Sequence, residues 1–383
     1  MSSLPATARK KLAHDAYRIG WICPLPVDLQ AALAMLDEVH ETLPQPRTDP
    51  TVYKLGSING HNIVIASLHQ PGNCPATMVA TLMQSTFRNL DFGLLVGIGG
   101  GVPTRSEAGM IRLGHVVVSK PTGTHSGAVK YSHGKAKDGV FERTGYINSP
   151  PVALLQAALS LDIDLEASEN CPISRNIERI LAKRKLRSKY QHPGLSKDHL
   201  QGPRDEETDE VIVHRGTIAS GELLLRDAVL RDQLAMEHGV LCFEMEAAGA
   251  LTDFRCLVIR GISNYCDVFK NDDWHGFASA AAAAYARQLF FHLPVEMEEN
   301  IRPRHFIVPF TRNRTFVGRE IFLEELRAKL CADDGARRLA ITGLGGIGKP
   351  QDAGRPADGL LVQGEPADGV HMLGAGLQHE RLR

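Results

Sequence analysis

Residues 240–249 have the sequence VLCFEMEAAG, in which two carboxylates flank a methionine at the end of a short apolar run. The apolar run predicts a buried strand, and the small residues from Ala247 onward predict the start of a helix. A carboxylate at such a junction either pairs with a charge or faces a ligand, because burying an isolated charge is costly. A ribose is one such ligand, since a carboxylate accepts hydrogen bonds from both vicinal hydroxyls and a thioether packs on the sugar. The alternative is an ordinary helix start, where Glu is also favoured.

The overall composition is that of a soluble globular protein. The 383 residues are 43% hydrophobic and 23% charged, which suits one large or two medium domains. The formal net charge of −1 predicts no attraction to nucleic acid or to a membrane surface. No apolar run approaches the roughly 18 residues of a membrane span, and residues 1–18 lack a signal core. The seven cysteines form no CxxC pair, so we expect a cytoplasmic protein without a metal or a cofactor.

Strand-like and helix-like segments alternate along most of the chain. Strand-like runs occupy residues 18–23, 63–68, 93–98, 115–119, 216–220 and 256–262. The run 93–98 is apolar throughout, as expected of a strand that is covered on both faces. Helical periodicity fills the intervals, including a helix that ends at Gly239 and an Ala-rich helix over residues 274–292. This alternation predicts an α/β protein with a mixed central sheet flanked by helices.

Polar residues or glycines follow four of the predicted strands. Asp28 begins the helix after the first strand, residues 99–101 are all glycine, and Glu246 and Asn264 follow two later strands. In open α/β sheets, ligands bind in a crevice outside the carboxyl ends of the strands. Glycines there let backbone N–H groups approach an anion or a sugar, although no GxGxxG fingerprint is present. The placements predict one shared ligand crevice.

Residues from about 163 to 212 differ in character from the rest. Residues 175–189 are strongly basic and helical in pattern, residues 191–203 contain Pro and Gly, and residues 205–210 are acidic. We expect a surface insertion that is partly flexible. The basic run could contact an anionic partner, but a solvated helix face is the simpler interpretation.

The C-terminal part predicts a separate, incomplete unit. Residues 299–315 form a linker rich in Arg and Pro, and residues 316–350 end in GLGGIGKP, which has the GxxxxGK pattern of a P-loop. Pro350 stands where Ser or Thr would hold Mg²⁺, and it removes a backbone donor. Residues 351–383 are rich in Gly, Ala, Asp and Pro, so we expect a disordered tail and no complete ATPase domain.

Four motifs in a fixed order carry a family resemblance over about residues 17–293. They are GIGGG (97–101), IASG (218–221), CFEMEAAG (242–249) and RGISNYCD (260–267). The set resembles the purine nucleoside phosphorylase/uridine phosphorylase family, especially its nucleosidase branch and the nucleosidase-like domains of fungal NOD-like receptors (NLRs). The P-loop segment resembles the start of an NB-ARC or NACHT domain. The resemblance implies a nucleoside phosphorylase-like domain over residues 1–298, a small-molecule nucleoside as partner, and a homo-oligomer, either a dimer or larger.

The resemblance also implies roles for residues of the sugar and base sites. Glu246 would hold the ribose hydroxyls, Met245 would pack on the sugar, and Glu244 would support them. Leu224 and Leu225, which follow IASG, match the segment that lines the base pocket.

The catalytic positions of the family are only partly matched. Asp28 stands where the nucleosidases have a Glu that activates water, and residues 98–100, Ile98, Gly99 and Gly100, match the loop beneath the sugar or the nucleophile. Asn264 stands where the nucleosidases have an Asp that protonates purine N7, and an amide cannot donate a proton in this way. Reduced activity or a preference for inosine or guanosine follows, because trimeric phosphorylases use Asn with 6-oxopurines. Asp267, three residues on, is a further catalytic candidate.

The choice between water and phosphate as nucleophile depends on charge. A phosphorylase needs Arg or Lys near the anomeric carbon, and the positions used by bacterial hexameric phosphorylases match Asp28 and Leu95 here. With no cation expected near the carboxylates, the sequence favours a purine nucleoside N-ribohydrolase. A phosphate-dependent phosphorylase, a catalytically weak nucleoside sensor of an NLR-type receptor, and a protein-interaction domain without ligand remain alternatives.

Overall fold

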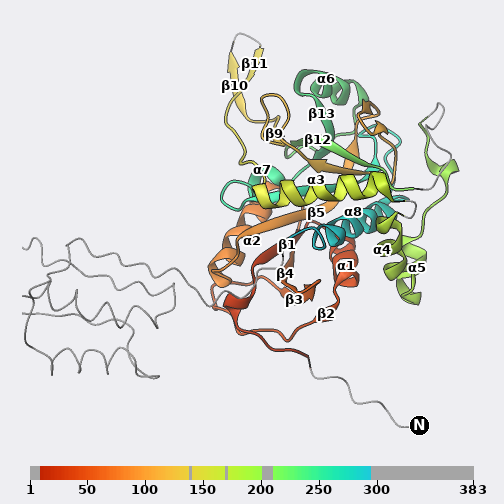
Figure 1. Cartoon of the computed structure of the whole chain (residues 1–383). Coiled ribbons are helices and arrows are strands. Elements are labelled where there is room, and N and C mark those ends of the chain that lie inside the picture. The colour runs from red at the N-terminus through yellow and green to blue at the C-terminus, as the bar shows by residue number, and fades with distance from the viewer. Residues whose placement is uncertain (1–8, 138–139, 169–170, 201–209, 295–383) are drawn as a thin grey trace, which may run out of the picture. The chain divides into compact units, whose positions relative to one another are not determined.

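The residues that the structure describes form a ten-stranded mixed sheet with helices packed on it (Figure 1). This computed structural model describes residues 9–137, 140–168, 171–200 and 210–294, all within the unit Met1–Val295. The predicted fold class, a mixed central sheet flanked by helices, is thereby confirmed. The expected linker, P-loop start and tail lie outside the described residues, as does most of the acidic segment 205–210.

The strands of the main sheet follow the predicted apolar runs. In spatial order they are β13 (Val240–Glu244), β12 (Val213–Ser220), β8 (Val116–Ser119), β14 (Cys256–Asn264), β5 (Phe92–Gly101), β1 (Ile19–Cys23), β4 (His61–Ser67), β3 (Tyr53–Ile58) and β2 (Glu38–Val39). β9 (Ala128–Lys130) lies beside β12. Two short hairpins are separate from this sheet, β6 (Arg105–Ser106) with β7 (Gly109–Met110) and β10 (Gly134–Lys137) with β11 (Val140–Arg143).

Five of these strands close into a ring. β5 pairs with β14, β14 with β8, β8 with β12, and β12 with β13. β13 then returns to β5 in antiparallel fashion, with Cys242 opposite Gly101 and Phe243 opposite Gly100. The closure brings the EMEAAG motif next to the glycine-rich end of β5.

The helices fill the intervals between strands, with two short 3₁₀ turns at His14–Ala16 and Leu195–Lys197. They are α1 (Pro26–Met35), α2 (Asn73–Thr86), α3 (Val152–Ala167), α4 (Pro172–Leu181), α5 (Arg184–Tyr190), α6 (Ala228–His238), α7 (Ala247–Ala250) and α8 (His275–Leu289). None of these described helices is both long and apolar enough to cross a membrane.

The Ala-rich helix α8 packs directly on the sheet. It contacts β14 and β5, and small side chains allow this close approach. A Cβ atom added at Gly261 of β14 would lie only 1.8 Å from the carbonyl oxygen of Ala278. Successive strand residues point to opposite faces, so Arg260 points away from α8.

The segment expected as a surface insertion is instead packed into the core over its helical part. Ile173, Ile177 and Ile180 of α4 are buried, and α4 contacts α8. The Tyr190 hydroxyl at the end of α5 donates a hydrogen bond to the Val27 carbonyl, with an O···O distance of 2.7 Å. Apolar residues at helical spacing lie between the basic residues of this segment. They form a stripe that packs against the core.

Candidate active site

A buried guanidinium joins the two carboxylates of the EMEAAG motif. Arg260 Nη2 lies 2.5 Å from Glu244 Oε2 and 3.1 Å from Glu246 Oε2. The Arg260 side chain is 1% exposed and those of Glu244 and Glu246 are 0% and 4% exposed. Glu244 ends β13 and Glu246 caps α7, so the strand ring brings both beside β14. A buried charge is tolerated when it is paired in this way.

The two glutamates use their carboxylates differently. Glu244 also accepts hydrogen bonds from the backbone N–H groups of Glu246 and Ala247, at 3.0–3.1 Å, so its side chain fixes the start of α7. Glu246 Oε1 accepts one hydrogen bond from the Gly72 N–H at 3.1 Å, just before α2. Gly72 has φ = +127°, a conformation that favours glycine. Since a carboxylate can accept about four hydrogen bonds, Glu246 keeps capacity for further donors such as hydroxyls.

Asp28 joins the same cluster from α1. The helix begins at Pro26 rather than at Asp28, so Asp28 is its third residue, and Oδ2 accepts from the Leu25 N–H at 3.0 Å. Oδ1 is buried and makes no hydrogen bond of good geometry to a described residue, although the Ser279 hydroxyl lies nearby. A Cβ atom at Gly97 of β5 would lie 2.9 Å from Asp28 Oδ2 and 2.8 Å from Arg260 Nη1. Asp28 and Arg260 therefore meet above Gly97, where any side chain would displace them.

Burial shifts the proton affinities of these carboxyl groups. Burial raises the pKa of Asp28 to about 6, although the nearby Ser279 hydroxyl and Arg260 act in the opposite direction. Burial likewise raises the pKa of Glu246 to about 7, again against the influence of Arg260. Proton affinities close to neutral are typical of groups that exchange protons in catalysis.

The expectation that no cation lies near the carboxylates is wrong. Arg260 is the first residue of the RGISNYCD motif, and the family resemblance implies no role for it. A charged residue inside the apolar run CLVIRGI was the available signal, because such a residue must find a buried partner. Its Nη2 is bound by the two glutamates, and its Nη1 donates to the Ile98 carbonyl at 3.3 Å. One guanidinium faces three carboxyl groups.

Asn264 lies beside Gly100, near the carboxyl end of β5. A register shift between Ile262 and Asn264 places Asn264 opposite Gly100, where an added Cβ would lie 3.0 Å from Asn264 Oδ1. Oδ1 accepts a hydrogen bond from the Cys266 N–H at 3.0 Å. Cys266 adopts φ = +54°, so the chain turns sharply after the strand.

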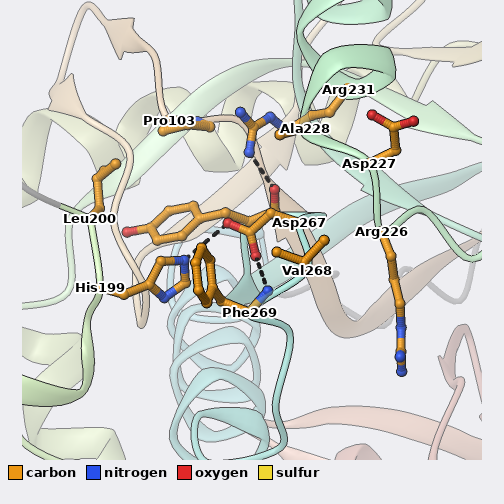
Figure 2. A pocket seen from close by; sticks show the side chains of 11 residues that line it. Pro103, His199, Leu200, Arg226, Asp227, Ala228, Arg231, Asp267, Val268 and Phe269 are labelled. Atoms are coloured by element: carbon orange, nitrogen blue, oxygen red, sulfur yellow. Dashed lines mark hydrogen bonds and ion pairs between the residues drawn. The ribbon is translucent and has the colours of Figure 1, made fainter.

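Asp267 follows that turn and lines a cavity of about 440 Å³ (Figure 2). His199 Nε2 lies 3.0 Å from Asp267 Oδ2. Pro103, Tyr265 and Arg226 also line the cavity. The two predicted base-pocket residues do not line this cavity. Leu224 is 51% exposed at the surface, and Leu225 is buried.

Other candidates lie around the carboxylate cluster. Met245 and Ile98 are half-buried, and Gly99 and Gly100 are buried. Leu225 packs in a second apolar cluster with Tyr131, Phe243 and Cys266. The Tyr131 ring excludes any side chain at Gly221, since an added Cβ would lie 2.6 Å from it.

Glu222, for which the sequence predicts no role, also lies near the site. Glu222 Oε1 accepts from the Asn73 N–H at 2.9 Å at the start of α2, beside Gly72. No group of three or more His, Cys, Asp or Glu side chains in the described ranges is arranged to hold a metal ion.

Comparison with known proteins gives relatives of two kinds. No protein-family model matches the chain. The chain is 38% identical over 369 residues to a nucleotide-binding leucine-rich repeat (NLR)-like protein of Hyaloscypha variabilis, covering 91% of this chain and 37% of that protein. It is 26% identical over 282 residues to the ATP nucleosidase Cap17 of Escherichia coli, covering 70% of this chain and 50% of the enzyme. The chain thus spans half or less of the length of these relatives.

The fold is also found among solved structures. Futalosine hydrolase of Helicobacter pylori superposes with a TM-score of 0.51 at 15% identity, over 73% of this chain and all of the hydrolase. At this identity the likeness concerns the fold alone. The chain is therefore a homologue of an NLR-like protein and of an ATP nucleosidase, and it has the nucleoside phosphorylase-like fold of the nucleosidases.

Proposed function

We propose that this protein hydrolyses the N-glycosidic bond of a purine nucleoside or nucleotide. The observation that carries the proposal is the convergence of Asp28, Glu244, Glu246 and Arg260 above the glycines of β5. A homologue named ATP nucleosidase supports this reaction class and suggests that the substrate includes 5′-phosphorylated nucleosides.

The geometry supports a division of roles. Glu246 has acceptor capacity left for the ribose hydroxyls, while Glu244 and Arg260 hold it in place. Asp28 has one buried oxygen that makes no hydrogen bond of good geometry, which suits a base that orients and deprotonates the attacking water. Cleavage of the bond leaves positive charge on the sugar, and a cluster with more carboxylates than cations stabilises that charge.

The same charge balance favours water over phosphate. A phosphate dianion needs uncommitted cationic donors, whereas both terminal nitrogens of Arg260 are already engaged by glutamate and backbone oxygens. Asp28, when ionised, would also repel the phosphate. Hydrolysis therefore remains favoured even though a cation, Arg260, lies in the cluster.

The nature of Asn264 bears on the base and on the alternative function. An amide can hydrogen-bond a 6-oxopurine but cannot protonate it, so inosine and guanosine derivatives are the preferred substrates to try. The presence of Asn rather than Asp at position 264 also supports a second candidate function. This is a nucleoside sensor in an NLR-type receptor, which would bind the nucleoside without turnover.

The first experiment incubates the purified chain with inosine, guanosine, adenosine and ATP, each with and without phosphate. We expect free base and ribose, or ribose phosphate ester from ATP, at rates that do not depend on phosphate. Glu246→Gln and Asp28→Asn should each lower the rate by roughly 10²-fold or more. Glu107→Gln is the matched control, because Glu107 is exposed and takes no part in the contacts described for the carboxylate cluster.

The outcomes separate the alternatives. Product that forms only with phosphate would identify a phosphorylase. Binding measured by calorimetry without any product would identify a sensor, and neither binding nor product would leave an interaction domain. We also propose a homo-oligomer, which light scattering of the same preparation would test.

A further inference from the structure

The cavity beside Asp267 contains an imidazole–carboxylate pair (Figure 2). His199 Nε2 lies 3.0 Å from Asp267 Oδ2, and the Phe269 N–H donates to Asp267 Oδ1 at 3.0 Å. The carboxylate thus lies between the imidazole and a backbone donor. Its side chain is 14% exposed and that of His199 is 31% exposed.

The imidazole packs against two aromatic rings. The His199 ring centre lies 5.3 Å from that of Tyr265, edge to face, and 5.1 Å from that of Phe269. The Tyr265 hydroxyl in turn lies 3.0 Å from Asp198 Oδ1, which also accepts from the Leu200 N–H at 3.1 Å. The orientation of His199 is therefore restricted by Tyr265, Phe269 and Asp267. No hydrogen bond of His199 Nδ1 to another described residue is found, so this atom is free to act on a bound molecule.

This cavity is lined by chain neighbours of three predicted site segments. Its lining residue Tyr265 follows Asn264 directly and Asp267 comes three residues after Asn264, while Arg226 follows Leu225 and Pro103 is the second residue after Gly101. A volume of about 440 Å³ falls in the range of small-molecule sites. Asn264 does not itself line the cavity, but its chain neighbour Tyr265 does, so a base bound beside Asn264 lies near the cavity.

The proposed reaction lacks a proton donor for the base. Asn264 cannot supply the proton, and its Oδ1 is already engaged by the Cys266 N–H. Imidazole is the side chain best suited to proton transfer near neutral pH. A carboxylate on its far nitrogen fixes the orientation of the ring.

We infer that His199 donates the proton to the departing purine and that Asp267 is its positioning residue. The inference rests on the proposed hydrolysis. The C1′–N9 bond breaks with its electron pair going to the base, and the imidazolium Nδ1–H is transferred to a ring nitrogen of the purine. Water adds to C1′ and loses its proton to Asp28. Both groups then regain their starting states by exchange with solvent, so nucleoside and water give neutral base and ribose.

The inference is tested with substrates that differ in their need for a proton. Inosine requires protonation of its base, whereas 7-methylguanosine carries a positive base that leaves without it. His199→Gln in the full chain should lower the rate on inosine by roughly 10²-fold and leave the rate on 7-methylguanosine close to that of the parent. Asp28→Asn should lower both rates, because both reactions need activated water.

A matched control and a second variant complete the experiment. His275→Gln removes an imidazole that pairs with Asp272 at 3.3 Å outside the cavity, and it should change neither rate. Asp267→Asn should show the same selectivity as His199→Gln with a smaller loss. If His199→Gln slows both substrates equally, or neither, His199 is not the proton donor.

The unmodified chain distinguishes failure of this inference from failure of the proposed function. Cleavage of 7-methylguanosine but not inosine would contradict the inference while leaving the hydrolase function intact. Cleavage of neither substrate, nor of the nucleosides and ATP above, would instead contradict the proposed function.

Discussion

Arg260 is the residue on which the buried charges of the site depend. It lies in the middle of β14, on the face opposite α8, and neutralises two glutamates that are almost inaccessible to water. Burial acts to lower the pKa of Arg260, but Glu244 and Glu246 outweigh it and raise this pKa. The side chain therefore stays charged, and the glutamates keep their positions only while it does.

Replacing this arginine should destabilise the fold. Arg260→Met leaves two buried carboxyl groups without their cation, so we expect a loss of roughly 3–5 kcal/mol in the free energy of unfolding. Urea denaturation of the wild type and of Arg260→Met measures this loss. Arg18→Met is the control, because the Arg18–Asp91 pair is exposed and its loss should cost less than about 1 kcal/mol. Equal losses in the two variants would show that Arg260 is not a buried counter-ion.

The Asp28 carboxyl should make stability depend on pH. Burial raises its pKa from 3.8 to about 6 in the folded protein, so the folded state binds this proton more tightly than the unfolded chain. Its contribution to stability is therefore full below pH 3.8 and is lost as the pH rises through about 6. The loss is on the order of 3 kcal/mol.

The measurement compares wild type with Asp28→Asn by urea denaturation between pH 4 and pH 7. The difference in unfolding free energy between the two proteins should change across this range, with the wild type losing stability relative to the variant as the pH rises. Parallel curves would show that Asp28 has the same pKa in the folded and unfolded states.

At the scale of elements, the contact of α8 with β14 depends on glycine. Because a Cβ at Gly261 would lie 1.8 Å from a backbone oxygen of α8, the clash cannot be relieved by turning a side chain. Gly261→Ala should therefore cost about 1–3 kcal/mol or more in stability. The shift of α8 would also disturb Arg260, the preceding residue.

Thermal denaturation of the Gly261→Ala variant measures this cost. Gly60→Asn is the control, since Gly60 has φ = +80° with no atom within 4 Å of an added Cβ, and Asn tolerates this conformation. We expect the control to unfold close to wild type. If Gly261→Ala does the same, α8 is not packed against β14 as the structure has it.

At the scale of the whole molecule, the site exists because the sheet closes on itself. β13 and β5 are more than 130 residues apart in sequence, yet Cys242 and Phe243 pair with Gly101 and Gly100. This pairing sets Glu244 and Glu246 beside Arg260 and above Gly97. The helices of the basic segment also join this core, so α1, which carries Asp28, is held by α4, α8 and Tyr190.

The sequence by itself determined the alternating α/β pattern, most strand positions and the family motifs, because apolar periodicity and glycine placement are local properties. It pointed to Asp28, Glu244 and Glu246, which the structure brings together. Only the tertiary structure decided that Arg260 neutralises them, that α4 and α5 are core helices, and that His199 faces Asp267. These depend on contacts between distant segments, and the partner of a buried charge is chosen by how the chain folds back rather than by its neighbours in sequence.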